Sequence, residues 1–338
     1  MEKSQKRINE VINQYDIDLA ESKTLQGGWI NQKIFIKDRK GNEYVLKELS
    51  LKKFPQYYFN TLCETVHIQD QLYNEKIKVP RIIKNKSGEC ITKIDNTYYF
   101  MQEFLKGNSK ETSELTSKEI KDIGKNLGLI HIALKSKNIR HFNTELLKYK
   151  TIDILSEELN SRKAQIIHDT PQEYIEELNL HQEIIDDLRK TKFLEDKETQ
   201  LIHGDFTPDN IIVSNNKLIG IIDFELVRIN STLQDIGRIV LSTCFYNNKF
   251  NSKKLNSFIK GYSEIISIDI NTIINSIKMV WCNEINIWIQ ERYFKNYNPP
   301  KIEKFIEEMK WISSNWFNIQ EIMKGVITSE ESKYKIRH

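Results

Sequence analysis

The sequence contains no apolar run that is long enough to cross a membrane. Its first residues, MEKSQKRINEVINQYDIDL, also lack the apolar segment of a secretory signal peptide. Cysteine is scarce, and no two cysteines are close enough for a zinc knuckle or a C-x-x-C redox pair; they are Cys63, Cys90, Cys244 and Cys282. Together these absences predict a cytoplasmic protein with reduced thiols.

A strong charge of either sign is missing as well. The 50 basic and 47 acidic residues leave a formal net charge of +3, which is too small to indicate a nucleic-acid or membrane partner. The sequence also has no internal repeat and no low-complexity linker. Its 338 residues exceed the size that one hydrophobic core usually serves, so we expect two lobes, in a monomer or homodimer.

The residue patterns change along the chain near Gly107. The first third has the pattern of a helix over 5–20, a hairpin over 25–49, a helix over 57–74, and strands over 79–83, 90–94 and 97–107. The remainder has helical spacing over 116–135 and 150–193, short strands over 201–224, and mainly helices from 233 onward. We therefore predict an α+β protein with a strand-rich lobe over residues 1–105 and a helical lobe over 106–338.

The motifs HGDFTPDN (203–210) and IIDFE (221–225) place Asp205, Asn210 and Asp223 beside apolar runs. A hairpin between the two motifs would bring Asp205, Asn210 and Asp223 into one small volume. Phosphoryl transfer needs such a set, because one carboxylate accepts the proton of the acceptor hydroxyl while an amide and a second carboxylate hold Mg²⁺. An Asx turn could explain either Asp205 or Asn210 alone, but not the whole set.

The first third offers three further parts of such a site. Gly27 and Gly28 precede the hairpin and would let backbone amides approach a phosphate, although Gly-Gly is also an ordinary turn. Lys47 lies in a predicted strand and Glu64 in the helix that follows, where each could equally be a solvent-facing residue. Their correct order upstream of the catalytic motif favours a kinase site over chance.

The whole set resembles the aminoglycoside phosphotransferase family, the small-molecule branch of the kinase-like fold. Gly204 replaces the arginine of protein kinases, Glu225 replaces the glycine of their D-F-G motif, and no A-P-E segment follows. Asp235, in QDIG, is similar to the family's aspartate that braces the catalytic loop, and it would also suit a helix N-terminus. The resemblance implies a protein-kinase-like bilobal fold with a small antiparallel-sheet N-terminal lobe and a larger helical C-terminal lobe.

The resemblance also implies residue roles. Asp205 would be the base, Asn210 and Asp223 the Mg²⁺ ligands, and Lys47 a contact to the phosphates of ATP or GTP that is paired with Glu64. The backbone of Gln102, Glu103 and Phe104 would bind the purine, and Met101 would be either a gatekeeper beside the base or a core residue. We expect His203 to be a structural turn residue and His131 a core histidine.

The acceptor site is expected between the catalytic loop and the late helices. Residues 276–294 are rich in aromatics and include Trp288, with Glu284 and Glu291 on one helix face. With Asp209 and Glu225 near the reaction centre, this lining would suit a polyamine or quaternary amine, although core packing explains most of these aromatics equally well. Three interpretations follow: a kinase for an aminoglycoside or another hydroxylated amine, a metabolic kinase for homoserine, choline or a sugar, and a non-catalytic relative of the spore-coat type.

Overall fold

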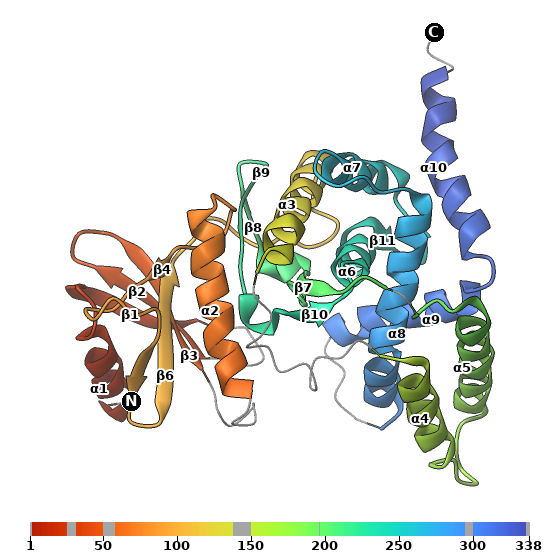
Figure 1. Ribbon diagram of the computed structural model, residues 1–338, viewed down its shortest axis with the longest axis horizontal. Coiled ribbons are helices and arrows are strands. Elements are labelled where there is room, and N and C mark those ends of the chain that lie inside the picture. The colour runs from red at the N-terminus through yellow and green to blue at the C-terminus, as the bar shows by residue number, and fades with distance from the viewer. Residues whose placement is uncertain are drawn as a thin grey trace.

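The computed structural model describes residues 2–25, 32–49, 58–137, 150–195, 197–294 and 300–335. A six-stranded antiparallel sheet with two helices forms one end of the molecule, and most of the helices form the other end (Figure 1). This arrangement confirms the predicted α+β class with a small antiparallel sheet and a larger helical region. The sheet end comprises α1 (Glu2–Ile12), β1 (Leu19–Leu25), β2 (Gln32–Asp38), β3 (Glu43–Leu49), α2 (Tyr58–Asn74), β4 (Ile82–Ile83), β5 (Thr92–Ile94) and β6 (Thr97–Glu103).

The two faces of this sheet have different partners. The strands run in the order β1-β2-β3-β6-β4, and β5 pairs with β6. One face, which includes Ile36, Leu46 and Met101, packs on the apolar side of α1. The opposite face, which includes Leu49 and Phe100, packs on α2 around Val66. Side chains alternate along a strand, so Lys47 lies on the face opposite to its neighbour Leu46 and on the same face as Leu49. Lys47 therefore lies on the α2 face.

The predicted N-terminal helix differs from the observed one. The spacing predicted a helix over 5–20, but α1 ends at Ile12 and the chain enters β1 at Leu19. β1 has the sequence LAESKTL and no buried residue, so it shows no apolar alternation. Its pairing with β2 makes it a strand, because an edge strand is held by the backbone ladder more than by side-chain burial.

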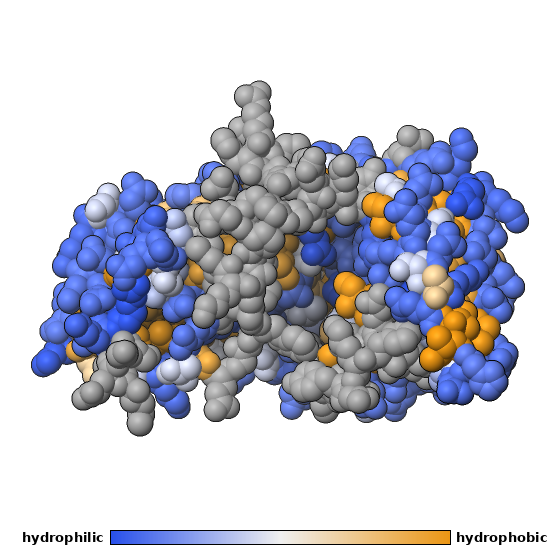
Figure 2. All heavy atoms as spheres, turned by 90° about the horizontal axis from the view of Figure 1, so that it is seen from below, coloured by the Kyte–Doolittle hydropathy of each residue, from blue (hydrophilic) through white to orange (hydrophobic). Residues whose placement is uncertain are grey.

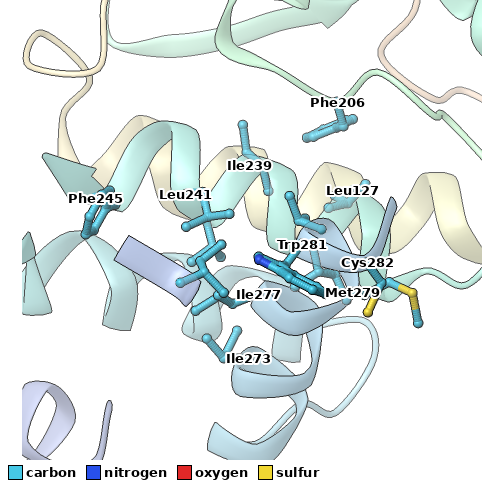
Figure 3. Packing of buried hydrophobic residues seen from close by; sticks show 14 of the residues in the cluster. Leu127, Phe206, Ile239, Leu241, Phe245, Ile273, Ile277, Met279, Trp281 and Cys282 are labelled. Atoms are coloured by element: carbon cyan, nitrogen blue, oxygen red, sulfur yellow. The ribbon is translucent and has the colours of Figure 1, made fainter. Parts of the chain in front are cut away.

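The helical end encloses a single large core. Its helices are α3 (Ser117–Lys135), α4 (Ile152–Lys163), α5 (Gln172–Thr191), α6 (Leu233–Cys244), α7 (Ser252–Ser263), α8 (Ile270–Phe294), α9 (Pro300–Asn315) and α10 (Ile319–Lys335). Side chains from α3, α6 and α8 meet there, among them Leu127, Ile239 and Trp281, with Phe206 beside them (Figure 3). Helix α3 begins at a capping box between Thr116 and Glu119, which fixes its first turn.

Short strands lie between the sheet and the helices. β7 (Gln200–Ile202) pairs with β10 (Arg228–Asn230), and β8 (Ile211–Ser214) forms a hairpin with β9 (Lys217–Ile221). Two 3-10 turns, η1 (Pro208–Asn210) and η2 (Phe224–Leu226), and the two-residue strands β11 (Phe245–Tyr246) and β12 (Lys249–Phe250) complete the fold. The β8–β9 hairpin reaches the first part of the chain through a bridge between Asn108 and Val213, just beyond the predicted lobe boundary at 105/106.

The surface of the molecule is largely hydrophilic where it is seen from below, and apolar side chains form separate patches there (Figure 2). Among the described residues, no helix combines the length and the apolar character that a membrane span requires.

Candidate active site

The two predicted motifs lie next to each other. HGDFTPDN connects β7 to β8, and IIDFE closes β9. The fully buried His203 joins them, since its Nε2 lies 3.0 Å from the Ile222 carbonyl oxygen and its Nδ1 accepts the Asp205 amide at 3.3 Å. These partners assign the ring proton to Nε2. Both ring nitrogens of His203 therefore hold the loop, and neither is left for acid-base chemistry.

Asp235 fixes the backbone of the catalytic loop from the first turn of α6. Its carboxylate accepts the amides of His203 at 2.8 Å and Gly204 at 2.9 Å, and His131 Nε2 lies 3.3 Å from it. Burial would raise the pKa of Asp235, but the bonds from His131 and the Gly204 amide outweigh burial and lower it. Tyr262 in turn contacts His131 Nδ1 at 2.8 Å. A buried anion thus holds the loop that carries Asp205.

Gly204 explains one departure from protein kinases. Its φ of +81° lies in the left-handed region, which favours glycine. A Cβ atom at this position would lie closer to the Leu226 carbonyl oxygen than van der Waals contact allows. The residue before Asp205 therefore has no room for a side chain, so an arginine like that of protein kinases would not fit.

Asp205 is half-buried and is held by Asn210. The Nδ2 of Asn210 donates to both the backbone oxygen and the Oδ2 of Asp205, each at 2.9 Å. Pro208 begins the 3-10 turn that returns Asn210 toward Asp205. Asp209, in the same turn, is exposed. The loop thus holds one half-buried carboxylate in a fixed orientation, as a general base requires.

Asp223 adopts a left-handed backbone conformation with φ +66° and contacts two lysines. Lys33 Nζ lies 2.7 Å from its Oδ2, and Lys47 Nζ bonds to its Oδ1. Burial would raise the pKa of this carboxyl group, but the charges of Lys47 and Lys33 hold it below its usual range. Asp223 is therefore an anion that has two cationic partners.

The predicted pairing of Lys47 with Glu64 is wrong in this structure. Lys47 is 1% exposed and bonds to Asp223 and, at 2.6 Å, to Glu225, while no Lys47–Glu64 ion pair occurs in the described part of the chain. The turn η2 packs against α2 and brings Glu225 to the lysine. Burial would lower the pKa of Lys47, but the two carboxylates raise it. Glu225, predicted as an acceptor contact, is itself buried against Lys47.

The donor set suits a magnesium ion. Asp223 supplies carboxylate oxygens, and Asn210 keeps its amide oxygen available while its Nδ2 bonds to Asp205. Oxygen ligands are those that Mg²⁺ prefers, and this ion keeps several waters and takes few protein groups. Among the described residues, no three or more His, Cys, Asp or Glu side chains form a cluster that could hold a metal by themselves.

The structure distinguishes the two interpretations of Met101 and corrects the amides expected to bind the purine. Met101 packs on the α1 face of the sheet, so it is a core residue, and alternation places the buried Gln102 on the α2 face, where Gln69 donates to it at 3.0 Å. The amides of Glu103 and Phe104 donate to the carbonyls of Arg81 and Glu43 at 2.9 and 3.0 Å. These two donors are therefore already used, and the next amide along the chain, that of Leu105, has no acceptor among the described residues.

The predicted acceptor residues on α8 form an internal network. Glu284 accepts hydrogen bonds from Gln234 at 2.8 Å, Arg238 at 2.8 Å and Trp288 at 2.9 Å. Arg238 also pairs with the buried Glu308. Glu284 and Trp288 are therefore structural residues in this arrangement, which the seven-residue spacing alone could not indicate. The side chain of Glu291 lies outside the described residues, as do Gly27 and Gly28 of the predicted phosphate loop.

The chain is similar in sequence to a known kinase. A curated homoserine kinase from Zymomonas mobilis subsp. mobilis is 23% identical over 208 residues, which cover 60% of this chain and 60% of that protein. The chain therefore matches less than two thirds of that relative's length.

Solved structures show the same fold. The amicoumacin kinase hAmiN, in complex with AMP-PNP, Ca²⁺ and Ami, has a TM-score of 0.67 at 15% identity, covering 92% of this chain and 93% of that one. The spectinomycin phosphotransferase APH(9)-Ia, in complex with ADP and spectinomycin, has a TM-score of 0.63 at 18% identity, covering 95% and 98%. The choline kinase LicA from Streptococcus pneumoniae has a TM-score of 0.60 at 15% identity, covering 92% and 99%.

The family model described as the phosphotransferase enzyme family, APH, matches residues 21–264, which are most of the sequence and include every motif residue discussed above from Lys47 to Asp235. The resemblance expected from the sequence is thereby confirmed. The chain belongs to the phosphotransferase enzyme family.

Proposed function

We propose that the protein transfers the γ-phosphoryl group of ATP or GTP to a hydroxyl group of a small molecule. The observation that carries this proposal is the loop around Asp205, whose backbone is held by Asp235 and whose side chain is held by Asn210. A carboxylate in a fixed position, next to a second anion and a buried lysine, is the arrangement that phosphoryl transfer requires. Family membership supports the same activity. The intact motif residues favour an enzyme over a non-catalytic relative.

In this mechanism Asp205 accepts the proton of the acceptor hydroxyl group while the oxygen of that hydroxyl group bonds to the γ-phosphorus. The bond from the γ-phosphorus to the β,γ-bridging oxygen breaks, and the nucleoside diphosphate leaves. Asn210 keeps the Asp205 carboxylate oriented, and Lys47 contacts the phosphates. Asn210 and Asp223 would hold Mg²⁺, which when bound neutralises the charge of the phosphates.

We place the purine beside the segment that follows β6. The Leu105 amide is the donor that this segment offers, because the Glu103 and Phe104 amides bond within the protein. The solved relatives were captured with both kinds of nucleotide, since hAmiN contains AMP-PNP and the aminoglycoside 2'-phosphotransferase-IIIa contains GDP. We therefore propose a purine nucleoside triphosphate as the donor, with ATP and GTP as the two candidates.

For the acceptor we propose an aminoglycoside or a similar hydroxylated amine, as in the solved relatives that contain spectinomycin or kanamycin. A second candidate is a smaller hydroxyl compound such as homoserine or choline. Two observations favour this second candidate: the similarity to a homoserine kinase, and the use of Glu284 by Arg238, Gln234 and Trp288. A carboxylate with three donors is less available to a polyamine.

A two-step experiment tests this proposal. The melting temperature is measured with Mg²⁺ and ATP or GTP, and labelled γ-phosphate transfer is then followed with aminoglycosides, choline and homoserine. We expect stabilisation that requires both nucleotide and Mg²⁺, and transfer to one class of acceptor. Absence of any nucleotide-dependent stabilisation at millimolar nucleotide would contradict the proposed activity.

A further inference from the structure

A second lysine lies beside Lys47 in the site. Lys33 on β2 is the cross-strand partner of Lys47 on β3, so the two side chains lie on the same face of the sheet. Lys33 is also in the site in three dimensions, since its Nζ is 2.7 Å from Asp223 Oδ2 and its side chain is 17% exposed. The sequence patterns did not single out this residue.

Asp223 therefore has a lysine on each carboxylate oxygen. A divalent cation on Asp223 would compete with these two ammonium groups, because like charges repel at such short range. Lys47 has a second carboxylate partner in Glu225, at 2.6 Å. Among the described residues, Asp223 is the only hydrogen-bond or ion-pair partner of Lys33. If a divalent cation bound Asp223, Lys33 would therefore be the lysine that needs a new anionic partner.

We propose that Lys33 is a nucleotide-binding residue that exchanges its contact with Asp223 for a contact with the nucleotide phosphates. The proposal rests on the proposed function, which brings a polyphosphate anion to this face of the sheet. Lys33 also follows Gly27 and Gly28 by only a few residues in the sequence, and it is the second residue of β2. Two lysines on neighbouring strands then share the negative charge of one triphosphate.

The test compares three variants by calorimetric titration with AMP-PNP in the presence of Mg²⁺. Lys33→Gln should raise the Kd by about tenfold, because it removes one charge-assisted hydrogen bond. Lys33→Arg keeps the charge and should bind within about threefold of the wild type. Lys37→Gln is the matched control on the same strand and face, where Lys37 is 43% exposed and pairs with Glu43 at 3.8 Å, and it should leave the Kd unchanged.

A second readout separates phosphate binding from structural support. At saturating AMP-PNP, the Mg²⁺ concentration that gives half of the thermal stabilisation should fall in Lys33→Gln, because one positive charge that repels Mg²⁺ near Asp223 and the phosphates is gone. A higher Mg²⁺ requirement, or an unchanged Kd for AMP-PNP, would overturn the role of Lys33. Failure of the wild type to bind AMP-PNP with Mg²⁺ would instead overturn the proposed function, together with this inference. If Lys33→Gln does not fold, the Lys33→Arg and Lys37→Gln variants still test the role of Lys33. A loss of affinity beyond tenfold in Lys33→Arg would contradict a contact that depends on the charge of Lys33.

Discussion

Replacement of Gly204 by alanine tests whether the catalytic loop depends on the close approach of Gly204 to Leu226. Two costs follow from the structure. An alanine at φ +81° costs about 1–2 kcal/mol of conformational energy. Its Cβ would also overlap the Leu226 carbonyl oxygen, so the loop must shift away from Leu226. Such a movement would weaken the bond from the Gly204 amide to the Asp235 carboxylate, and a hydrogen bond to a charged group contributes about 1.5–3 kcal/mol.

The two costs together predict that Gly204→Ala lowers the free energy of unfolding by about 2.5–5 kcal/mol. Chemical denaturation measures this change, and Gly41→Ala provides the matched control. Gly41 has φ +87°, and a Cβ atom there would meet nothing within 4 Å. This control should therefore lose only the conformational part, about 1–2 kcal/mol. Equal destabilisation by the two substitutions would refute the reasoning, because the contact with Leu226 would then have no effect.

Two further substitutions test buried charges. Asp235→Asn should lower stability at pH 7 by about 1–3 kcal/mol. The lowered pKa of Asp235 means that its carboxylate stabilises the fold above about pH 4 and loses that contribution as the pH falls, so Asp235→Asn should lose less stability than the wild type between about pH 5 and pH 2. Parallel pH–stability curves for the two proteins would count against this role. Arg238→Met leaves Glu284 and Glu308 without their cation and should cost about 3–5 kcal/mol in urea denaturation. Arg189→Met, in an exposed pair, should cost less than about 1 kcal/mol, and equal costs for the two arginines would be the opposite result.

The parts of the fold that could be predicted from the sequence are those with a strong local pattern. Helix α3 has an apolar stripe, and the turn KDRKGN marks the β2–β3 hairpin because glycine and polar residues interrupt two apolar runs. Strand β1 was missed because it has no buried residue and depends on its pairing with β2. Local periodicity contains no information about a partner that is supplied by another strand.

In the candidate site, too, residues in local motifs were predictable and contacts between distant elements were not. Asp205, Asn210 and Asp223 were predictable because they lie in two short motifs that a single hairpin joins. The partner of Lys47 was not, because the approach of Glu225 depends on how η2 packs on α2.

Lys33 could have been found from the hairpin register. A hairpin centred on Lys40 pairs residues whose numbers add to 80, which sets Lys33 opposite Lys47. Met101 could have been assigned to the core by the same counting, since its register partner on β3 is Leu46, an apolar neighbour of Lys47 that must face the other side of the sheet.

The most direct test of the central claim is the rate of γ-phosphoryl transfer by Asp205→Ala. The substitution removes the base and its hydrogen bond to Asn210, while Lys47 and Asp223 remain in place for the nucleotide. We expect turnover with the acceptor found in the screen to fall by about 10²–10⁴-fold, with the Kd for Mg²⁺ and AMP-PNP within about threefold of the wild type. Turnover that stays near the wild-type rate would contradict the assignment of Asp205 as the base of a phosphotransferase.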